Sequence, residues 1–225
     1  MDSNIKEEIL SFLSSTYSAS KDNQYSIYKD KDKWIVDADH SLIVSNFNIQ
    51  HLTNDLFEFG IVNGTFDCGD CKKLESLEGA PKEVRDSFYC DFCKNLKSLK
   101  GAPEKVGGDF FCRNCPNLKS LKGAPKEVKR DFYCTRCTNL ESLEGAPEKV
   151  KGDFYCDGCE KLKSLEGAPE YVGGYFDCSR CENLNFLKGA PEKVGGDFLC
   201  RGCKNLKSLE GAPKVIKGRF IHDDI

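Results

Sequence analysis

The chain has 225 residues and a formal net charge of −3, with 14 cysteines and 15 phenylalanines beside one methionine and one tryptophan. This length suits one domain, and the near-neutral charge argues against the basic field typical of nucleic-acid-binding proteins. The acidic first residues lack the apolar core of a secretory signal, and no segment approaches the ~18 apolar residues of a membrane span. We therefore expect a cytoplasmic protein with reduced cysteines.

Residues 1–60 are predicted to form a small α+β cap. Ile5, Ile9 and Leu13 share one helical face within residues 4–16, and the segments YSIY and KWIVDA are typical of two strands. A degenerate first repeat follows, with its apolar positions at Leu42, Val44, Phe47, Ile49 and Leu52. A solenoid must cover its first coil, so we interpret this region as a cap. The alternative is a separate binding domain.

Residues 61–225 contain seven 22-residue repeats and a truncated eighth strand. Each repeat has a phenylalanine, a cysteine two residues later and a second cysteine three residues after that, as at Phe88, Cys90 and Cys93. Two leucines, Gly-Ala-Pro and a valine follow. Phe-x-Cys has the period of a strand with both side chains on one face, and Gly-Ala-Pro predicts a turn. Each repeat is therefore expected to be one coil, with a strand of three to five residues, a bend and an irregular or polyproline-like return.

These coils resemble leucine-rich repeats. Phe88 and Cys90 match the two apolar strand positions of that family, Cys93 its Asn/Cys position and Leu96 the next apolar position, shifted by one residue. The segment SLEGAPKEV is similar to repeats of bacteriophage and short bacterial proteins, over about residues 40–225. The resemblance implies a mainly β, leucine-rich-repeat-like solenoid with a parallel sheet on its concave face. It further implies a phage-encoded protein that acts on a host factor in a bacterial cytoplasm. Those relatives often have asparagine at the second cysteine, so here we expect burial to hold the turn.

The paired cysteines allow two interpretations. Adjacent repeats place two C-x-x-C motifs eighteen residues apart, which is close to a zinc-ribbon spacing and would suit a metal-binding structural protein. Cysteine is also among the most buried residue types, and both columns share the register of the phenylalanines and leucines. No aspartate or histidine column completes a ligand set. We therefore expect buried thiols, no metal and no cofactor.

The exposed strand positions are the candidate partner-binding surface. Aromatic residues fill consecutive outward positions, aspartates precede the phenylalanines, and arginines and one phenylalanine follow the first cysteine. The candidate site comprises Tyr89, Phe92, Phe111, Arg113, Tyr133, Arg136, Tyr155, Tyr175, Asp109, Asp131 and Asp153. Aromatic residues and arginines on a rigid sheet are typical of interface hot spots. The alternative is that the aromatic residues only stabilise the sheet by stacking.

This pattern predicts a non-enzymatic solenoid that binds a protein partner. Nucleic acid is a weaker alternative, because aromatic residues on a sheet can stack bases but the aspartates would repel phosphate. No catalytic residue is expected, since the repeat pattern does not place a cysteine or serine nucleophile beside any of the three histidines. We also expect a homodimer through the C-terminal edge strand at Phe220, unless Arg219, Asp223 and Asp224 blunt that edge.

Overall fold

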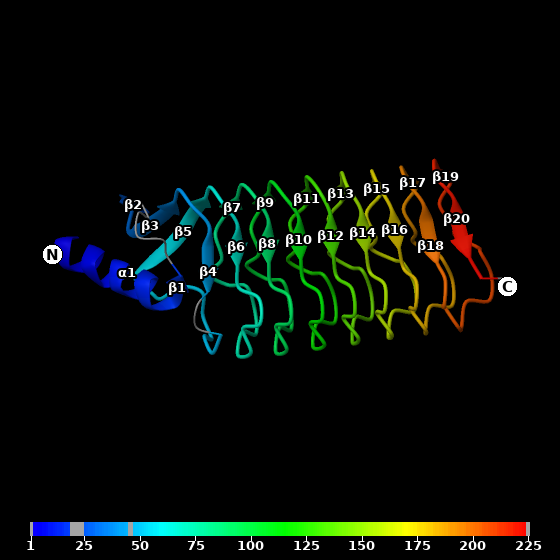
Figure 1. Cartoon of the computed structure of the whole chain (residues 1–225), viewed down its shortest axis with the longest axis horizontal. Helices are drawn as coiled ribbons and strands as arrows, with labels where there is room; N and C mark the ends of the chain where they lie inside the picture. Colours follow the sequence, from blue (N-terminus) through cyan, green and yellow to red (C-terminus); the bar gives the residue numbers. More distant parts are fainter. Residues whose placement is uncertain (1, 19–24, 45–46, 224–225) are drawn as a thin grey trace.

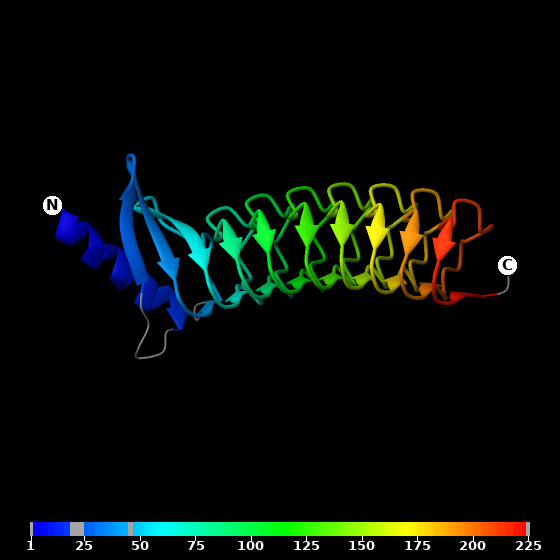
Figure 2. The ribbon, with the colours of Figure 1, turned by 90° about the horizontal axis from the view of Figure 1, so that it is seen from above.

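The computed structural model describes residues 2–18, 25–44 and 47–223. The chain is a β-solenoid of stacked coils with one helix, α1 (Asp2–Thr16), at its N-terminal end (Figure 1). The coils follow one nearly straight axis, with the C-terminus at the opposite end from the helix (Figure 2). The expected mainly β solenoid with a parallel sheet and an α+β N-terminal end is confirmed, and the structure adds a second sheet.

One sheet, here called the Phe sheet, contains the Phe-x-Cys segments. Its strands are parallel except for the first pair, and most span two residues. In spatial order they are β1 (Tyr17–Ser18), β4 (Leu42–Val44), β6 (Phe66–Asp67), β8 (Phe88–Tyr89), β10 (Phe110–Phe111), β12 (Phe132–Tyr133), β14 (Phe154–Tyr155), β16 (Phe176–Asp177), β18 (Phe198–Cys200) and β20 (Phe220–His222). The outward side of this sheet is the surface that we expected to carry the candidate site.

A second sheet, here called the Val sheet, contains the valine column. In spatial order its strands are β2 (Tyr25–Asp30), β3 (Lys33–Ala38), β5 (Phe57–Val62), β7 (Glu83–Val84), β9 (Lys105–Val106), β11 (Glu127–Val128), β13 (Lys149–Val150), β15 (Tyr171–Val172), β17 (Lys193–Val194) and β19 (Val215–Ile216). The expectation of an irregular or polyproline-like return is therefore wrong at this column. Two residues per coil sufficed to form a strand because each pairs in register with its counterparts in the adjacent coils.

The core lies between the two sheets and runs without a break from the cap to Leu206. Equivalent phenylalanines stack face to face along the axis, with centroids of Phe110 and Phe132 at 5.2 Å and of Phe132 and Phe154 at 5.3 Å. The cysteine, leucine and valine columns are buried beside them over most of the solenoid. The alternation predicted from Phe-x-Cys is confirmed.

The glycine of Gly-Ala-Pro is required by the backbone at this corner. Gly101 has φ +88°, and a Cβ there would lie 2.5 Å from the Glu78 backbone in the preceding coil. Only glycine adopts this conformation at such a close approach without strain. Six further glycines of this column share the positive φ, so the turn recurs in every repeat.

The N-terminal region covers the first coil. The predicted strands form the antiparallel hairpin β2–β3, which continues into the Val sheet through β5, and Ile9 and Leu13 of α1 are buried. The degenerate repeat holds at β4 and at buried Leu52, but Phe47 is 48% exposed. β5 crosses the boundary predicted at residue 60, so the cap and the repeats share one core.

The C-terminal end is partly closed by side chains. The Asp223 carboxylate accepts a hydrogen bond from the Gly202 N–H at 2.6 Å, in the place where earlier coils offer a backbone carbonyl. The Arg219 guanidinium donates twice to Asp197. Asp224 lies outside the described residues. These contacts supply part of the blunting considered above, and dimerisation through β20 stays a prediction.

Candidate functional site

Four outward residues of the Phe sheet form one aromatic stack, here called the aromatic stripe: Tyr89, Phe111, Tyr133 and Tyr155. Successive ring centroids are 4.4, 4.6 and 4.9 Å apart, with the planes within 9° of parallel. Each inner ring is therefore covered on both faces by its neighbours, and the rings are half-buried. Along its length the stripe therefore presents ring edges rather than open ring faces, and only the outer faces of Tyr89 and Tyr155 have no stacked ring among the described residues.

The aspartates beside the stripe connect adjacent coils. Oδ1 of Asp109 accepts the Asp131 N–H, Oδ1 of Asp131 accepts the Asp153 N–H, and Oδ1 of Asp153 accepts the Tyr175 N–H, at 2.7–3.0 Å. The Tyr133 and Tyr155 hydroxyls donate to Oδ2 of the aspartate two residues earlier. Burial raises the pKa of both tyrosines, and these hydrogen bonds raise it further. The aspartate column thus has a structural role, and Tyr175 remains exposed at its end.

Arg113 lies on the outward face, but two of its guanidinium nitrogens are already engaged. Its Nε and Nη2 donate to Oδ2 of Asp91 at 3.0 and 2.7 Å, and the guanidinium lies 4.8 Å from the Phe111 ring centroid. Asp91 is almost fully buried, and among the described residues no other cation forms an ion pair with it. Because an unpaired buried carboxylate is costly, this pair is expected to stabilise the fold more than it contributes to binding.

The residue before each second cysteine forms a corner ridge at the edge of the Phe sheet. The ridge comprises Asp70, Phe92, Asn114, Arg136, Gly158, Arg180 and Gly202. All seven have positive φ between 54° and 70°, the left-handed conformation that glycine and asparagine tolerate best. Phe92 is 49% exposed there and stacks on no other ring among the described residues.

The ridge brings Phe92 and Arg136 of the predicted site onto one edge, with Arg180 as an addition that the sequence-based selection left out. A column that mixes Gly, Asn and Asp with bulky residues could have indicated the positive φ. Arg180 donates to Oδ2 of Asp157 at 3.0 Å, whereas the Arg136 guanidinium has no hydrogen bond or ion pair within the described part of the chain.

The fourteen cysteines are free and buried, as expected. Hydrogen bonds hold the turn in addition to burial, because the thiol of the second cysteine of a repeat donates to a carbonyl of the preceding coil. The Cys93 thiol donates to the Cys68 carbonyl at 3.2 Å, and Cys115 does so to Cys90 at 3.3 Å. The thiol thus satisfies a backbone group that would otherwise be buried without a partner.

We expect the purified, reduced protein to contain no stoichiometric zinc. Most thiols are already hydrogen-bonded to backbone carbonyls, and across residues 2–18, 25–44 and 47–223 no group of three or more ligating side chains is placed to hold a metal. Elemental analysis of the purified protein checks this. One or more zinc ions per chain, lost together with the fold on chelation, would contradict it.

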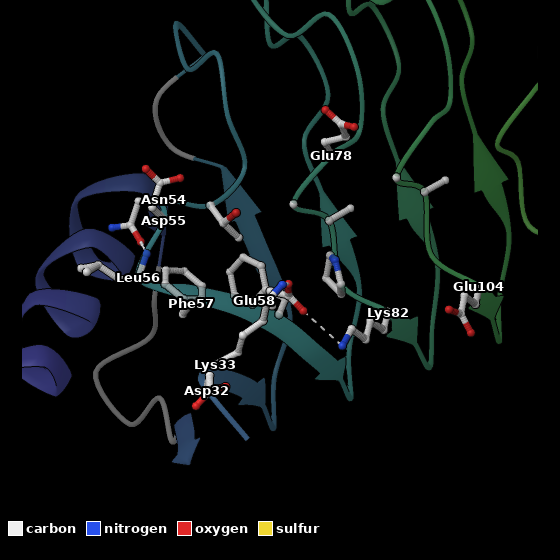
Figure 3. A pocket seen from close by; sticks show the side chains of 17 residues that line it. Asp32, Lys33, Asn54, Asp55, Leu56, Phe57, Glu58, Glu78, Lys82 and Glu104 are labelled. Carbon is white, nitrogen blue, oxygen red and sulfur yellow. Dashed lines mark hydrogen bonds and ion pairs between the residues drawn. The ribbon is translucent and has the colours of Figure 1, made fainter. Parts of the chain in front are cut away.

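A cleft of about 520 Å³ lies between the cap and the first two Gly-Ala-Pro turns (Figure 3). Its residues come from separate segments, so no single motif indicated it. Lys33 and Lys82 both form ion pairs with Glu58, which lower the pKa of Glu58. Glu78 pairs with Lys100. Four of the charged groups that line the cleft, Lys33, Glu58, Glu78 and Lys82, are thus in ion pairs.

No protein-family model, curated protein or solved structure matches this chain. Among the described helices, none has the length and apolar character needed to cross a bilayer. A function for the chain therefore has to be inferred from its own geometry.

Proposed function

We propose that this chain is a non-enzymatic scaffold that binds a protein partner through the outward side of its Phe sheet and the adjoining corner ridge. The rigid, hydrogen-bonded aromatic stripe supplies a preorganised surface, which lowers the entropic cost of binding. The resemblance to phage and bacterial repeats points to a phage-encoded protein that acts on a host factor in the bacterial cytoplasm.

The observation that carries this proposal is Phe92. A phenylalanine with φ +58° costs about 1 kcal/mol relative to a favourable backbone conformation, and half of its side chain faces solvent. Gly158 and Gly202 occupy the same position in other coils with the same turn. Since the fold does not require a large side chain here, a contact outside the chain is the best reason for it.

Nucleic acid is a poorer occupant of this face. Proteins that bind single strands stack bases on exposed aromatic faces. The inner faces of the aromatic stripe are filled by neighbouring rings, and the aspartate column lies alongside. A protein partner can instead contact ring edges, hydroxyl groups and the ridge.

Phe92→Asn is expected to raise the free energy of unfolding by up to about 1 kcal/mol, because asparagine adopts positive φ more readily than phenylalanine. Asn114 already fills this position in the next coil. Chemical denaturation followed by circular dichroism measures the change. The matched control is Phe186→Ser, which replaces another phenylalanine, 48% exposed, by the residue that its own column has in the neighbouring repeats.

The same two variants test binding. Immobilised wild-type protein and Phe186→Ser should retain a partner from lysate of the source organism or its host, whereas Phe92→Asn should retain at least about tenfold less of it, the effect of one interface hot spot. Quantitative mass spectrometry of the eluates gives the ratio. Equal capture by Phe92→Asn, or no protein enriched over bare matrix, would count against the proposed function.

A further inference from the structure

A groove of about 620 Å³ runs along the corner ridge across five coils. One side is the ridge from Phe92 to Arg180, and the other is the column two residues later, from Lys94 to Glu182. Four coil-to-coil steps of ~4.8 Å give a length of about 19 Å. At ~3.3 Å per residue, this length accommodates about six residues of an extended peptide.

The backbone of the ridge has no N–H groups left for a partner along this groove. The N–H groups of Phe92, Arg136 and Arg180 donate to carbonyls of the following coil at 2.7–2.8 Å, and those of Asn114 and Gly158 do the same at 2.9 Å. A peptide therefore cannot bind here by accepting ridge hydrogen bonds as an added strand would. We therefore assign recognition to the side chains that line the groove.

The side chains that line the groove differ in polarity and in ion pairing from one end to the other. The exposed ring of Phe92 and the Lys94 ammonium lie on the coil nearest the cap, and Arg136 lies on the middle one of the five coils. Neither Lys94 nor Arg136 has an ion-pair partner among the described residues. Further along, Arg180 is paired with Asp157, and Glu182 with Lys204. Glu160 contributes a negative charge without an ion-pair partner in the described coils. The positive charges without an ion-pair partner and the exposed apolar ring therefore lie between the cap end and the middle of the groove.

We infer that this groove holds an extended acidic segment of the partner, with an apolar side chain against Phe92 and a carboxylate on Arg136. A guanidinium binds a carboxylate through two parallel hydrogen bonds, so Arg136 would fix the register of the segment. Glu160, one coil beyond Arg136, would repel a second acidic residue of the segment. The segment is therefore expected to have its acidic residue at Arg136 and no acidic residue further from the cap. Continuous phosphates of a nucleic acid would meet Glu160 and Glu182. This inference rests on the proposed function.

A random dodecapeptide library displayed on phage tests the inference without knowledge of the partner. Panning against the wild-type protein, with counter-selection on Arg136→Gly, should enrich peptides that carry Asp or Glu within a few residues of Leu, Phe, Tyr or Trp. Arg136→Gly installs the residue that Gly158 and Gly202 already provide in this conformation, so the variant is expected to fold. Enrichment of basic or uncharged peptides, or no enrichment, would overturn the inference.

The enriched peptide is then synthesised and measured by fluorescence anisotropy. Arg136→Gly and Phe92→Asn should each weaken its binding at least tenfold, while Asn114→Gly, a change within the same ridge, should alter it less than twofold. Equal binding by Arg136→Gly would overturn the inference, as would tighter, Arg136-dependent binding of a random single-stranded 12-mer DNA. If the peptide experiments give a contrary result while capture from lysate still depends on Phe92, the acidic segment is the wrong occupant of the groove. The proposed scaffold function then stands.

Discussion

Cys203 is expected to react with N-ethylmaleimide roughly a hundredfold or more faster than any other cysteine of the folded protein, because reaction elsewhere requires the solenoid to open. Cys203 is 8% exposed, whereas the other cysteines are at most 1% exposed. It also lies in the last described coil that contains cysteines. Each repeat of a solenoid contacts only its adjacent repeats, and an end repeat has only one such neighbour. Local unfolding is therefore easiest at an end of the solenoid and hardest in the middle.

The thiol pKa values favour the same order. Burial raises the pKa of the first-column thiols, including Cys134 in the middle of the solenoid and Cys200, whose pKa rises to about 12. A hydrogen bond with the Cys178 thiol instead lowers the pKa of Cys203. Because the thiolate is the reactive species, the Cys203 thiol is more reactive at neutral pH on both counts.

Timed labelling followed by peptide mass spectrometry resolves the individual cysteines. In concentrated guanidinium chloride all of them should react at similar rates, which shows that the native protection comes from the fold. Cys203→Ser is the matched control, and it should remove the fast phase while the other cysteines stay unlabelled. Native labelling of Cys134 as fast as Cys203 would contradict the burial and stability order described here.

Phe132→Ala is expected to lower the free energy of unfolding by about 3–5 kcal/mol, the usual range for a buried aromatic residue. Phe132 is fully buried and stacks between Phe110 and Phe154, so alanine leaves a cavity in the middle of the core. Urea denaturation followed by circular dichroism measures the change. The slope with denaturant should be checked, since long repeat arrays can depart from two-state unfolding.

Tyr133→Ala, one residue away, should cost less, about 1–3 kcal/mol, because its ring is partly exposed and loses two stacking contacts worth about 0.5–1.5 kcal/mol each. Tyr133→Phe preserves the stack and removes only the hydrogen bond to Asp131, so it should be nearly neutral. A loss from Tyr133→Ala as large as that from Phe132→Ala would show that the inward and outward faces are assigned wrongly.

Much of the coil was predictable because the repeat samples one local structure seven times. The 22-residue period predicted the coil, the Phe-x-Cys spacing predicted which side chains point inward, and Gly-Ala-Pro predicted the turn. Burial of the cysteines followed from their register with the phenylalanines. Each of these inferences depends on neighbours along the chain, and the spacing of such neighbours is set by strand geometry.

The tertiary structure decided which contacts each side chain makes with the next coil. The valine column forms a second sheet, the Asp131 carboxylate binds the Asp153 N–H, and the Cys93 thiol binds the Cys68 carbonyl. Stacking closes the inner faces of the aromatic stripe, while Phe92 and Arg136 lie along the groove. The partners in these contacts are about 22 residues apart, and their distances depend on the rise and register between coils. A repeat pattern indicates that equivalent residues are near one another, but hydrogen bonds and ring contacts require the relative placement of two coils to within about half an ångström.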